Sequence, residues 1–345
     1  MLKFPIIDPT EPKLPTSGEV INNETYYSTH DTQFIDAGDG DDLFISRGYG
    51  TTFDGGSGID TVDYSSIWWG GVKVDLEDTG PDANRDNTDT LINVENVIGT
   101  DFDDRITGNA SDNYLSGGGG NDVLFGRRGN DTLVGGDGVD FLDGGRDDDQ
   151  LFGGDDSDFL IGGDGADILN GGAGVDTAEY TGSTVGVTAN LATGYGVGGH
   201  ADGDIYISVE NLSGSHHSDV LVGDKGANTL HGLAGNDRID GGEGDDHLHG
   251  GAGADIFVFE NDRRGGPDLR HGNDVIYDFK VGIDKIDLSR TEVDDWDDID
   301  DDRGNYGMYQ DGANAVIYTL DGRNDDTITL VDVHVDDLRE SDFLF

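Results

Sequence analysis

The most regular feature of this chain is an aliphatic residue at every ninth position. Nine segments of nine residues follow one another without a gap from Gly99 to Glu179, and each begins with Gly. Their eighth positions are Ile106, Leu115, Leu124, Leu133, Leu142, Leu151, Leu160, Leu169 and Ala178. The last three positions of each segment predict a very short strand, with the eighth residue pointing inward and its two neighbours outward. Two segments make one coil of 18 residues, so equivalent turns should stack one coil apart.

The first six positions of each segment predict a tight turn that carries an acid. Typical copies read GGGGNDVLF and GGDGADILN. Glycine reaches backbone angles that other residues avoid, which favours turns at these positions. The sixth position is Asp in every copy except one, where it is Asn113. A turn rich in carbonyl oxygens and carrying a carboxylate suits a hard cation, above all Ca²⁺.

Two further blocks repeat the pattern. Three less regular segments span residues 37–63, and five segments span residues 214–258. We expect the sixth-position aspartates of all three blocks to be the metal ligands: Asp42, Asp60, Asp104, Asp122, Asp131, Asp140, Asp149, Asp158, Asp167, Asp176, Asp219, Asp237, Asp246 and Asp255. If each pair of turns 18 residues apart holds one ion, the upper bound is about 11 Ca²⁺ ions.

The regions between the blocks break the nine-residue period. Residues 1–33 are rich in proline and predict an extended tail or a strand that lies along the roll. Residues 34–98 hold the short block and then an insert. Alternation over Val72–Leu76 predicts a half-buried strand within this insert. A second insert spans 180–213, between the long block (99–179) and the five-segment block (214–258). Val94-Glu95-Asn96 returns as Val209-Glu210-Asn211, which indicates a larger internal duplication.

The nine-residue pattern resembles the RTX (repeats-in-toxin) nonapeptide, G-G-x-G-x-D-x-U-x, where U is aliphatic. The resemblance covers residues 37–63, 99–179 and 214–258, and it implies a roll stabilised by Ca²⁺ bound between turns. Residues 272–289, the segment Ala315–Tyr318 and the ending Asp342–Phe345 resemble the C-terminal region of serralysin-type metallopeptidases. That second resemblance implies that residues 259–345 cap the roll and carry a type I secretion signal.

The expected fold is all-β. We predict a right-handed parallel β-roll (a β-solenoid) in stacked RTX blocks, with β-rich inserts and a C-terminal β cap. The alternative is a disordered linker rich in Gly and Asp, but such a linker has no reason to keep its aliphatic residues in a fixed phase.

Charge and composition limit the classes of molecule that could bind this protein. The 345 residues include 73 acidic and 20 basic ones, a formal net charge of −53, and no Cys. Such a surface argues against nucleic acid and anionic membrane as partners and favours cations. Without cations, the high charge and low hydrophobicity predict a disordered chain. No apolar run is long enough for a transmembrane helix, and the N-terminal residues lack the apolar stretch of a cleaved secretory signal.

The usual catalytic motifs are absent. The sequence contains no H-E-x-x-H, no G-x-S-x-G and no Cys nucleophile, and the signature associated with RTX-bearing mannuronan epimerases is not visible. We therefore expect a secreted, extracellular or cell-surface protein that is not an enzyme, exported by type I secretion machinery and involved in adhesion, matrix association or binding of a surface polysaccharide. Two alternatives remain open: an enzyme acting on a polysaccharide, and a surface protein that self-assembles with Ca²⁺.

Three smaller constellations allow more than one interpretation. His231 and His249 are both ninth-position residues 18 apart, so they should stack, with His247 on the same face; a transition-metal site competes there with ordinary solvent-facing side chains. Trp68-Trp69 suits stacking on a sugar ring or packing on the roll. The acidic run Asp294–Asp302 lacks the glycine that an EF-hand loop requires, which favours a solvated loop.

Overall fold

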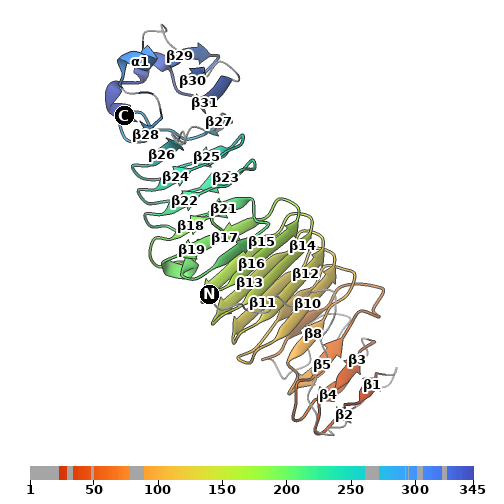
Figure 1. Cartoon of the computed structure of the whole chain (residues 1–345). Helices are drawn as coiled ribbons and strands as arrows, with labels where there is room; N and C mark the ends of the chain where they lie inside the picture. Colours follow the sequence, from red (N-terminus) through yellow and green to blue (C-terminus); the bar gives the residue numbers. More distant parts are fainter. Residues whose placement is uncertain are drawn as a thin grey trace. The chain divides into compact units, whose positions relative to one another are not determined.

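The fold is seen in a computed structural model that describes residues 23–28, 34–47, 50–77, 89–260, 272–291, 293, 295–300, 306–320 and 325–345. The expected tail at 1–33 and the acidic run at 294–302 therefore lie partly outside the described residues. Two compact units are present: unit 1 comprises Met1–Leu160 with Asn170–Gly174, and unit 2 comprises Ile161–Leu169 with Val175–Phe345. Nearly all described residues belong to strands and turns, which confirms the all-β class (Figure 1).

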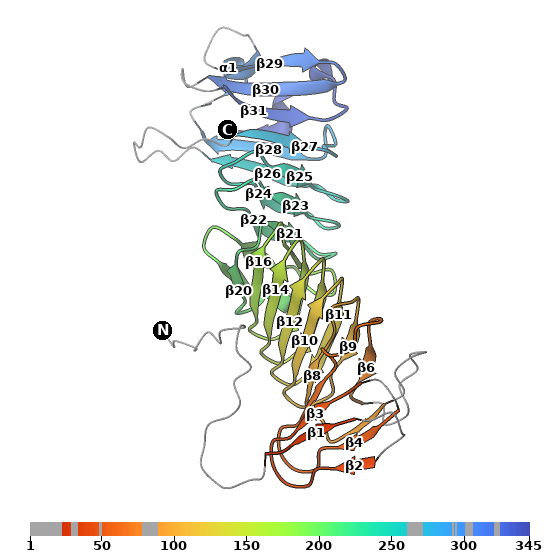
Figure 2. The ribbon, with the colours of Figure 1, turned by 90° about the vertical axis from the view of Figure 1, so that its right-hand side faces the viewer.

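Unit 1 is built from ladders of parallel strands. One ladder runs β1 (Thr25–Tyr27), β3 (Leu43–Ile45), β5 (Thr61–Asp63), β8 (Asn96–Ile98), β10 (Tyr114–Gly119), β12 (Thr132–Asp137) and β14 (Gln150–Asp155). A second runs β6 (Lys73–Asp75), β9 (Arg105–Thr107), β11 (Val123–Arg128) and β13 (Phe141–Arg146). A short third ladder contains β2 (Phe34–Asp36), β4 (Thr52–Asp54) and β7 (Thr90–Ile92). Figure 2 shows β10, β12 and β14 side by side.

Strands β15 (Phe159–Asp164) and β16 (Ile168–Ala173) contribute residues to both units. In unit 2 one ladder runs β20 (Ile205–Ile207), β19 (Tyr195–Val197), β18 (Thr188–Asn190), β22 (Val220–Val222), β24 (Arg238–Asp240), β26 (Ile256–Glu260), β28 (Lys285–Arg290) and β32 (Phe343–Leu344). Another runs β17 (Thr177–Glu179), β21 (Asn211–Ser213), β23 (Thr229–His231), β25 (His247–His249), β27 (Asn273–Ile276), β31 (Asp325–Leu330), β30 (Asn314–Leu320) and β29 (Tyr306–Asp311).

Most of these pairings are parallel, and the antiparallel ones mark where the repeats give way to other sequence. They occur at β18–β19–β20 in the second insert and at β29–β30–β31 near the C-terminus. The short helical segments of the described chain are α1 (Asp297–Asp300) and three 3₁₀ turns, η1 (Gly199–Ala201), η2 (Val335–Asp337) and η3 (Glu340–Asp342). None of the helices in the described residues is long and apolar enough to cross a membrane.

The core consists of the eighth-position column. Leu115 aligns with Leu133 and Leu124 with Leu142, each pair one 18-residue coil apart, and all four side chains are 0% exposed. The seventh and ninth positions of the same strands are only partly buried. The predicted register and the parallel β-roll are therefore confirmed, because a slip of one residue would have exposed the whole aliphatic column.

Two features differ from the sequence prediction. The strands β10 to β16 are six residues long, twice the expected length. The extra residues come from the turn that follows: Gly118 pairs with Gly136 and Gly119 with Asp137, so the glycine-rich turns themselves continue the ladder. In the five-segment block the strands β22 to β25 keep the expected three residues.

The stacked coils also extend beyond both ends of the predicted repeats, which run from residue 37 to residue 258. Strand β1 lies inside the expected tail and pairs with β3 as one more coil. At the other end the nine-residue period stops at Phe259, as predicted, but the coils do not. Strand β27 aligns Leu248 with Ile276, and β28 aligns Phe257 with Ile286, so the core column continues into the C-terminal region.

Candidate metal centre

All fourteen predicted aspartates lie in buried columns along the edges of the roll. Each is between 0% and 3% exposed. One carboxylate oxygen, Oδ1, accepts a hydrogen bond from the backbone N–H of the sixth residue one coil earlier. Examples are Asp104 N to Asp122 Oδ1 at 2.7 Å and Asp131 N to Asp149 Oδ1 at 2.7 Å. Predicted ligands such as Asp122 and Asp149 therefore also link neighbouring coils.

The second oxygen, Oδ2, is the unusual atom. In several of these aspartates it is buried and has no hydrogen-bond partner among the described residues: Asp42, Asp60, Asp122, Asp131, Asp140, Asp237, Asp246 and Asp255. It lies against the first glycine of its own turn, so closely that a Cβ on Gly117 would be 2.0 Å from Asp122 Oδ2. A buried carboxylate oxygen without a donor costs free energy, so this position calls for a cation or a proton.

Carbonyl oxygens surround the same turns. A Cβ built on Gly136 would lie 2.0 Å from the carbonyl oxygen of Gly118, and one on Gly138 would lie 1.9 Å from that of Gly120. Gly136 and Gly138 have φ values of 123° and 119°, which glycine adopts without strain. The second and fourth residues of one turn therefore direct carbonyl oxygens at the next turn, and a side chain at Gly136 or Gly138 would clash with them.

Burial raises the pKa of the column. The pKa of Asp122 rises to about 8, mainly through burial, with the carboxylates of Asp104 and Asp140 adding to the effect against the hydrogen bond from Asp104 N. Burial likewise raises the pKa of Asp131 and Asp237 to about 7. A bound cation would lower the pKa of these carboxyls and so favour their ionised form. Without a cation, burial favours the protonated form.

Asp104 and Asp219 depart from this pattern, and they do so together. The N–H of Thr100 donates to Asp104 Oδ2 at 2.6 Å, and the N–H of Ser215 donates to Asp219 Oδ2 at 2.6 Å. Both turns start a block after an insert, 115 residues apart, so the inferred duplication extends to individual hydrogen bonds. Gly118 and Gly136 have a positive φ instead, and in their turns the Oδ2 of Asp122 and of Asp140 has no such donor among the described residues. The conformation of the second residue therefore distinguishes the two kinds of turn.

The second turn of each of the two later blocks has an asparagine at position 6. Asn113 Nδ2 donates to the carbonyl of Glu95 at 2.8 Å, and Asn228 Nδ2 donates to that of Glu210 at 2.6 Å. The amide NH₂ is a hydrogen-bond donor and carries no charge. In these two turns it bonds to the carbonyl oxygens of Glu95 and Glu210, which therefore need no cation.

The sequence prediction missed several members of the column. Thr51 N donates to Asp89, Asp60 N to Glu95, and Asp167 N to Asp204. The others of this kind are Glu210, Asp274 and Asp284. All six precede an x-aliphatic-x or x-Tyr-x triplet, which is the signal that could have identified them. Their backbone N–H donors lie 28–38 residues earlier in the chain rather than 18, so the nine-residue phase does not reveal them.

A second ladder runs through position 5. Asn130 N donates to Asp112 Oδ1 at 2.8 Å and Val139 N donates to Asn121 Oδ1 at 2.8 Å, each across 18 residues. Asp or Asn at position 5 therefore links successive turns on their exposed side, as the position-6 side chains link the same turns on their buried side.

Two of the three smaller constellations lie wholly within the described residues. His231 and His249 stack as predicted, with ring centroids 4.4 Å apart, and Tyr277 continues the stack at 4.7 Å. Trp68 and Trp69 meet edge to face, and Trp68 is 78% exposed.

No group of three or more His, Asp or Glu side chains within the described ranges has an arrangement that could hold a metal ion. An ion at the turns would therefore take one or two position-6 carboxylates and draw its other ligands from backbone carbonyls. The glycine-lined turns provide such carbonyls, and oxygen-only coordination of this kind is what Ca²⁺ prefers. The residues present thus fit calcium and do not fit a metal that needs His or Cys.

The comparison with protein families agrees with this chemistry. The RTX calcium-binding nonapeptide repeat is found at residues 98–133, 116–151, 125–160, 144–178, 213–248 and 222–257. Among solved structures, the AlgE6R3 subunit of the Azotobacter vinelandii mannuronan C5-epimerase is 29% identical, with a TM-score of 0.31, over 39% of this chain and 77% of that chain. The extracellular lipase LipA of Serratia marcescens is 17% identical, with a TM-score of 0.25, over 76% of this chain and 42% of the lipase. No curated protein matches. The chain therefore contains RTX hemolysin-type calcium-binding nonapeptide repeats, folded as a parallel β-roll.

Proposed function

We propose that this is a secreted protein whose roll folds when Ca²⁺ binds its turns outside the cell. The observation that carries the proposal is the buried Oδ2 of residues such as Asp122, Asp131 and Asp237, which has no donor among the described residues. These carboxylates and the carbonyls of the surrounding turns would hold the ions. Bound calcium would supply positive charge to a column that burial otherwise makes costly to ionise.

Calcium availability makes this arrangement a switch. Extracellular calcium modules have dissociation constants of roughly 10⁻⁴–10⁻³ M, far above the calcium concentration of a cytosol. Inside the cell the carboxylates would repel one another, and a chain with net charge −53 would stay extended for export. Outside, binding at one pair of turns orders a turn shared with the next pair, so folding is cooperative along the stack.

Export through type I machinery is supported by the C-terminal resemblance noted above, whose Asp342-Phe-Leu-Phe345 ending has the expected acidic and apolar character. A non-enzymatic role in adhesion or matrix association fits the missing catalytic motifs. The exposed pair Trp68 and Trp69 favours a polysaccharide as the outer partner, because a solvent-exposed aromatic pair is a typical recognition surface.

Circular dichroism during a calcium titration tests the proposal. With chelator we expect a disordered spectrum, and with millimolar calcium a β spectrum that appears over a narrow concentration range. Magnesium is the control, because it retains its water and demands tighter octahedral geometry, so it should fail at the same concentration. A full β spectrum and a sharp thermal transition in chelator would contradict the calcium switch. Glycan-array binding that is lost in Trp68→Ala would separately support the polysaccharide partner.

A further inference from the structure

Arg127 occupies a position that the turn normally reserves for glycine. It is the second residue of its segment and has φ = 81°, whereas the equivalent residues of neighbouring turns are Gly118, Gly136 and Gly145. An arginine in this left-handed region is strained relative to glycine. The contacts of its side chain explain what offsets that strain.

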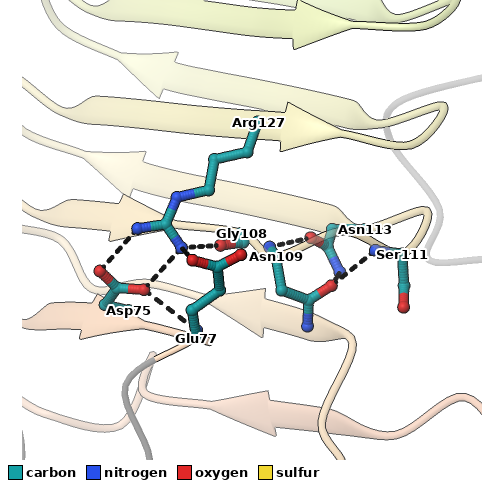
Figure 3. A network of polar contacts seen from close by, with 7 residues as sticks. All are labelled: Asp75, Glu77, Gly108, Asn109, Ser111, Asn113 and Arg127. Atoms are coloured by element: carbon teal, nitrogen blue, oxygen red, sulfur yellow. Dashed lines mark hydrogen bonds and ion pairs between the residues drawn. The ribbon is translucent and has the colours of Figure 1, made fainter.

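The guanidinium reaches from its own turn to the turn one coil earlier (Figure 3). It forms a two-pronged ion pair with Asp75, at 2.9 Å from Nη1 to Oδ1 and 2.9 Å from Nη2 to Oδ2. Nη1 also donates to the carbonyl oxygen of Gly108 at 2.8 Å and lies 3.1 Å from Glu77 Oε2. A positive group thus bonds to a turn carbonyl and to carboxylates of the first insert. These are the ligand types expected around calcium.

The gap between the turns at 108–113 and 126–131 differs in charge from a neighbouring gap. Between the turns that end at Asp122 and Asp140, both position-6 residues are acidic, and the Oδ2 of each has no donor among the described residues. Between the turns that end at Asn113 and Asp131, one carboxylate is replaced by an amide and one guanidinium is added. Among the second- and sixth-position side chains, the second gap therefore has one fewer negative charge and one more positive charge. Asp75 and Glu77 pair with that positive charge, and the guanidinium already bonds to the Gly108 carbonyl oxygen, which disfavours a divalent cation there.

We propose that Arg127 is a built-in cation that takes the place of one calcium ion, between the turns at 108–113 and 126–131. The inference rests on the proposed calcium-dependent folding, and it identifies one gap between turns that does not need calcium. Arginine suits the role because its planar fork binds a carboxylate and a carbonyl together and stays charged at any relevant pH.

Unit 2 contains a parallel case. Lys280 occupies the second position of the continued segment that ends in Asp284, and its Nζ donates to the carbonyl oxygen of Gly251 in the turn one coil earlier. Its backbone N–H donates to Asp284 Oδ2 at 2.8 Å, so this carboxylate already has a donor. The roll thus holds fewer calcium ions than one for every pair of turns.

Arg127→Gly tests the proposal, because two explanations predict opposite results. If Arg127 is only a tolerated departure from glycine, the substitution relieves backbone strain, so the calcium midpoint for folding falls and the number of bound ions stays the same. If Arg127 replaces an ion, the midpoint rises and the variant binds one more ion at saturation. Equilibrium dialysis with calcium gives the ion number, and circular dichroism gives the midpoint.

Two further variants complete the test. Arg128→Ala removes the same charge from the next, exposed residue and should leave both readouts unchanged. Asp75→Asn weakens the ion pair while retaining Arg127, so it should raise the midpoint without adding an ion, and it serves if Arg127→Gly fails to fold. Equal ion numbers in wild type and Arg127→Gly, or unchanged midpoints in Arg127→Gly and Asp75→Asn, would overturn the inference. Absence of calcium binding by the wild type would instead contradict the proposed function.

Discussion

Acid should partly substitute for calcium, because protons and calcium ions act on the same buried carboxylates. Burial raises the pKa of Asp122 to about 8, against an ordinary value of about 3.9 in an unfolded chain. A raised pKa means that the folded form binds more protons than the unfolded form between these two values. The stability from this group is therefore fully present below about pH 4 and is lost as pH rises through about 8.

The size of the effect follows from these values. At pH 7 the unfolded carboxyl lies about three pH units above its pKa, and each unit corresponds to about 1.4 kcal/mol, so keeping this one group in the calcium-free roll costs about 4 kcal/mol. Asp131 and Asp237, with pKa values raised to about 7, act in the same direction. A change of this size is comparable to the whole stability of many domains.

The assay is circular dichroism of calcium-depleted protein between about pH 8 and about pH 5, with the calcium midpoint measured at each pH. The β signal without calcium should increase towards pH 5, and the calcium midpoint for folding should fall, because protons already stabilise the folded form. Asp122→Asn should reduce the pH dependence, whereas Asp137→Asn, which removes an exposed charge, should not. A calcium-free β signal that is flat or falls towards pH 5 would refute the reasoning.

Three other substitutions or deletions test separate parts of the structure. Leu142→Asp places an unpaired charge in the fully buried column and should cost several kcal/mol, raising the calcium midpoint in a titration, while Thr132→Asp on the partly exposed face should change it little. Gly117→Ala forces a methyl group against a carboxylate oxygen and should lower the melting temperature by the equivalent of about 1–3 kcal/mol; Gly70→Ala, which has open space, is the matched control. Removal of 342–345 should keep the protein in the cytoplasm of cells that co-express a type I transporter, as measured in the culture supernatant, and undiminished secretion would show that the signal lies elsewhere.

The parts of the structure that keep a strict period were predictable from the sequence. Leu142 and Asp140 recur in phase with their equivalents nine and 18 residues away, so one register assigns both the core and the ligand column. The parallel β-roll follows from that register. The longer strands were not foreseen, because glycine has a low strand propensity and nothing in the sequence indicates that Gly118 pairs with Gly136.

The residues that interrupt the period were harder to place. Glu95 follows a long excursion of the chain, and only the fold returns it to the coil edge where it accepts from Asp60 N across 35 residues. Arg127 looks like a simple replacement of glycine in the sequence, and its contact with Asp75, 52 residues away, requires the insert to be placed first. Periodicity alone cannot supply such contacts, because it specifies positions only relative to the nearest coil.

The spacing of the coil contacts also sets how quickly the roll can form. Within a block each new coil closes a loop of only 18 residues, as from Asp104 to Asp122, so contact order stays low however many coils are added. The first insert stretches this separation to 35 residues between Asp60 and Glu95, and the second to 34 between Asp176 and Glu210. Doubling a loop costs only about 0.6 kcal/mol of closure entropy, or roughly a threefold slower step. Zippering of the roll should therefore pause briefly at each insert and continue at full speed beyond it, so a chain emerging from a narrow channel can fold nearly as fast as it appears.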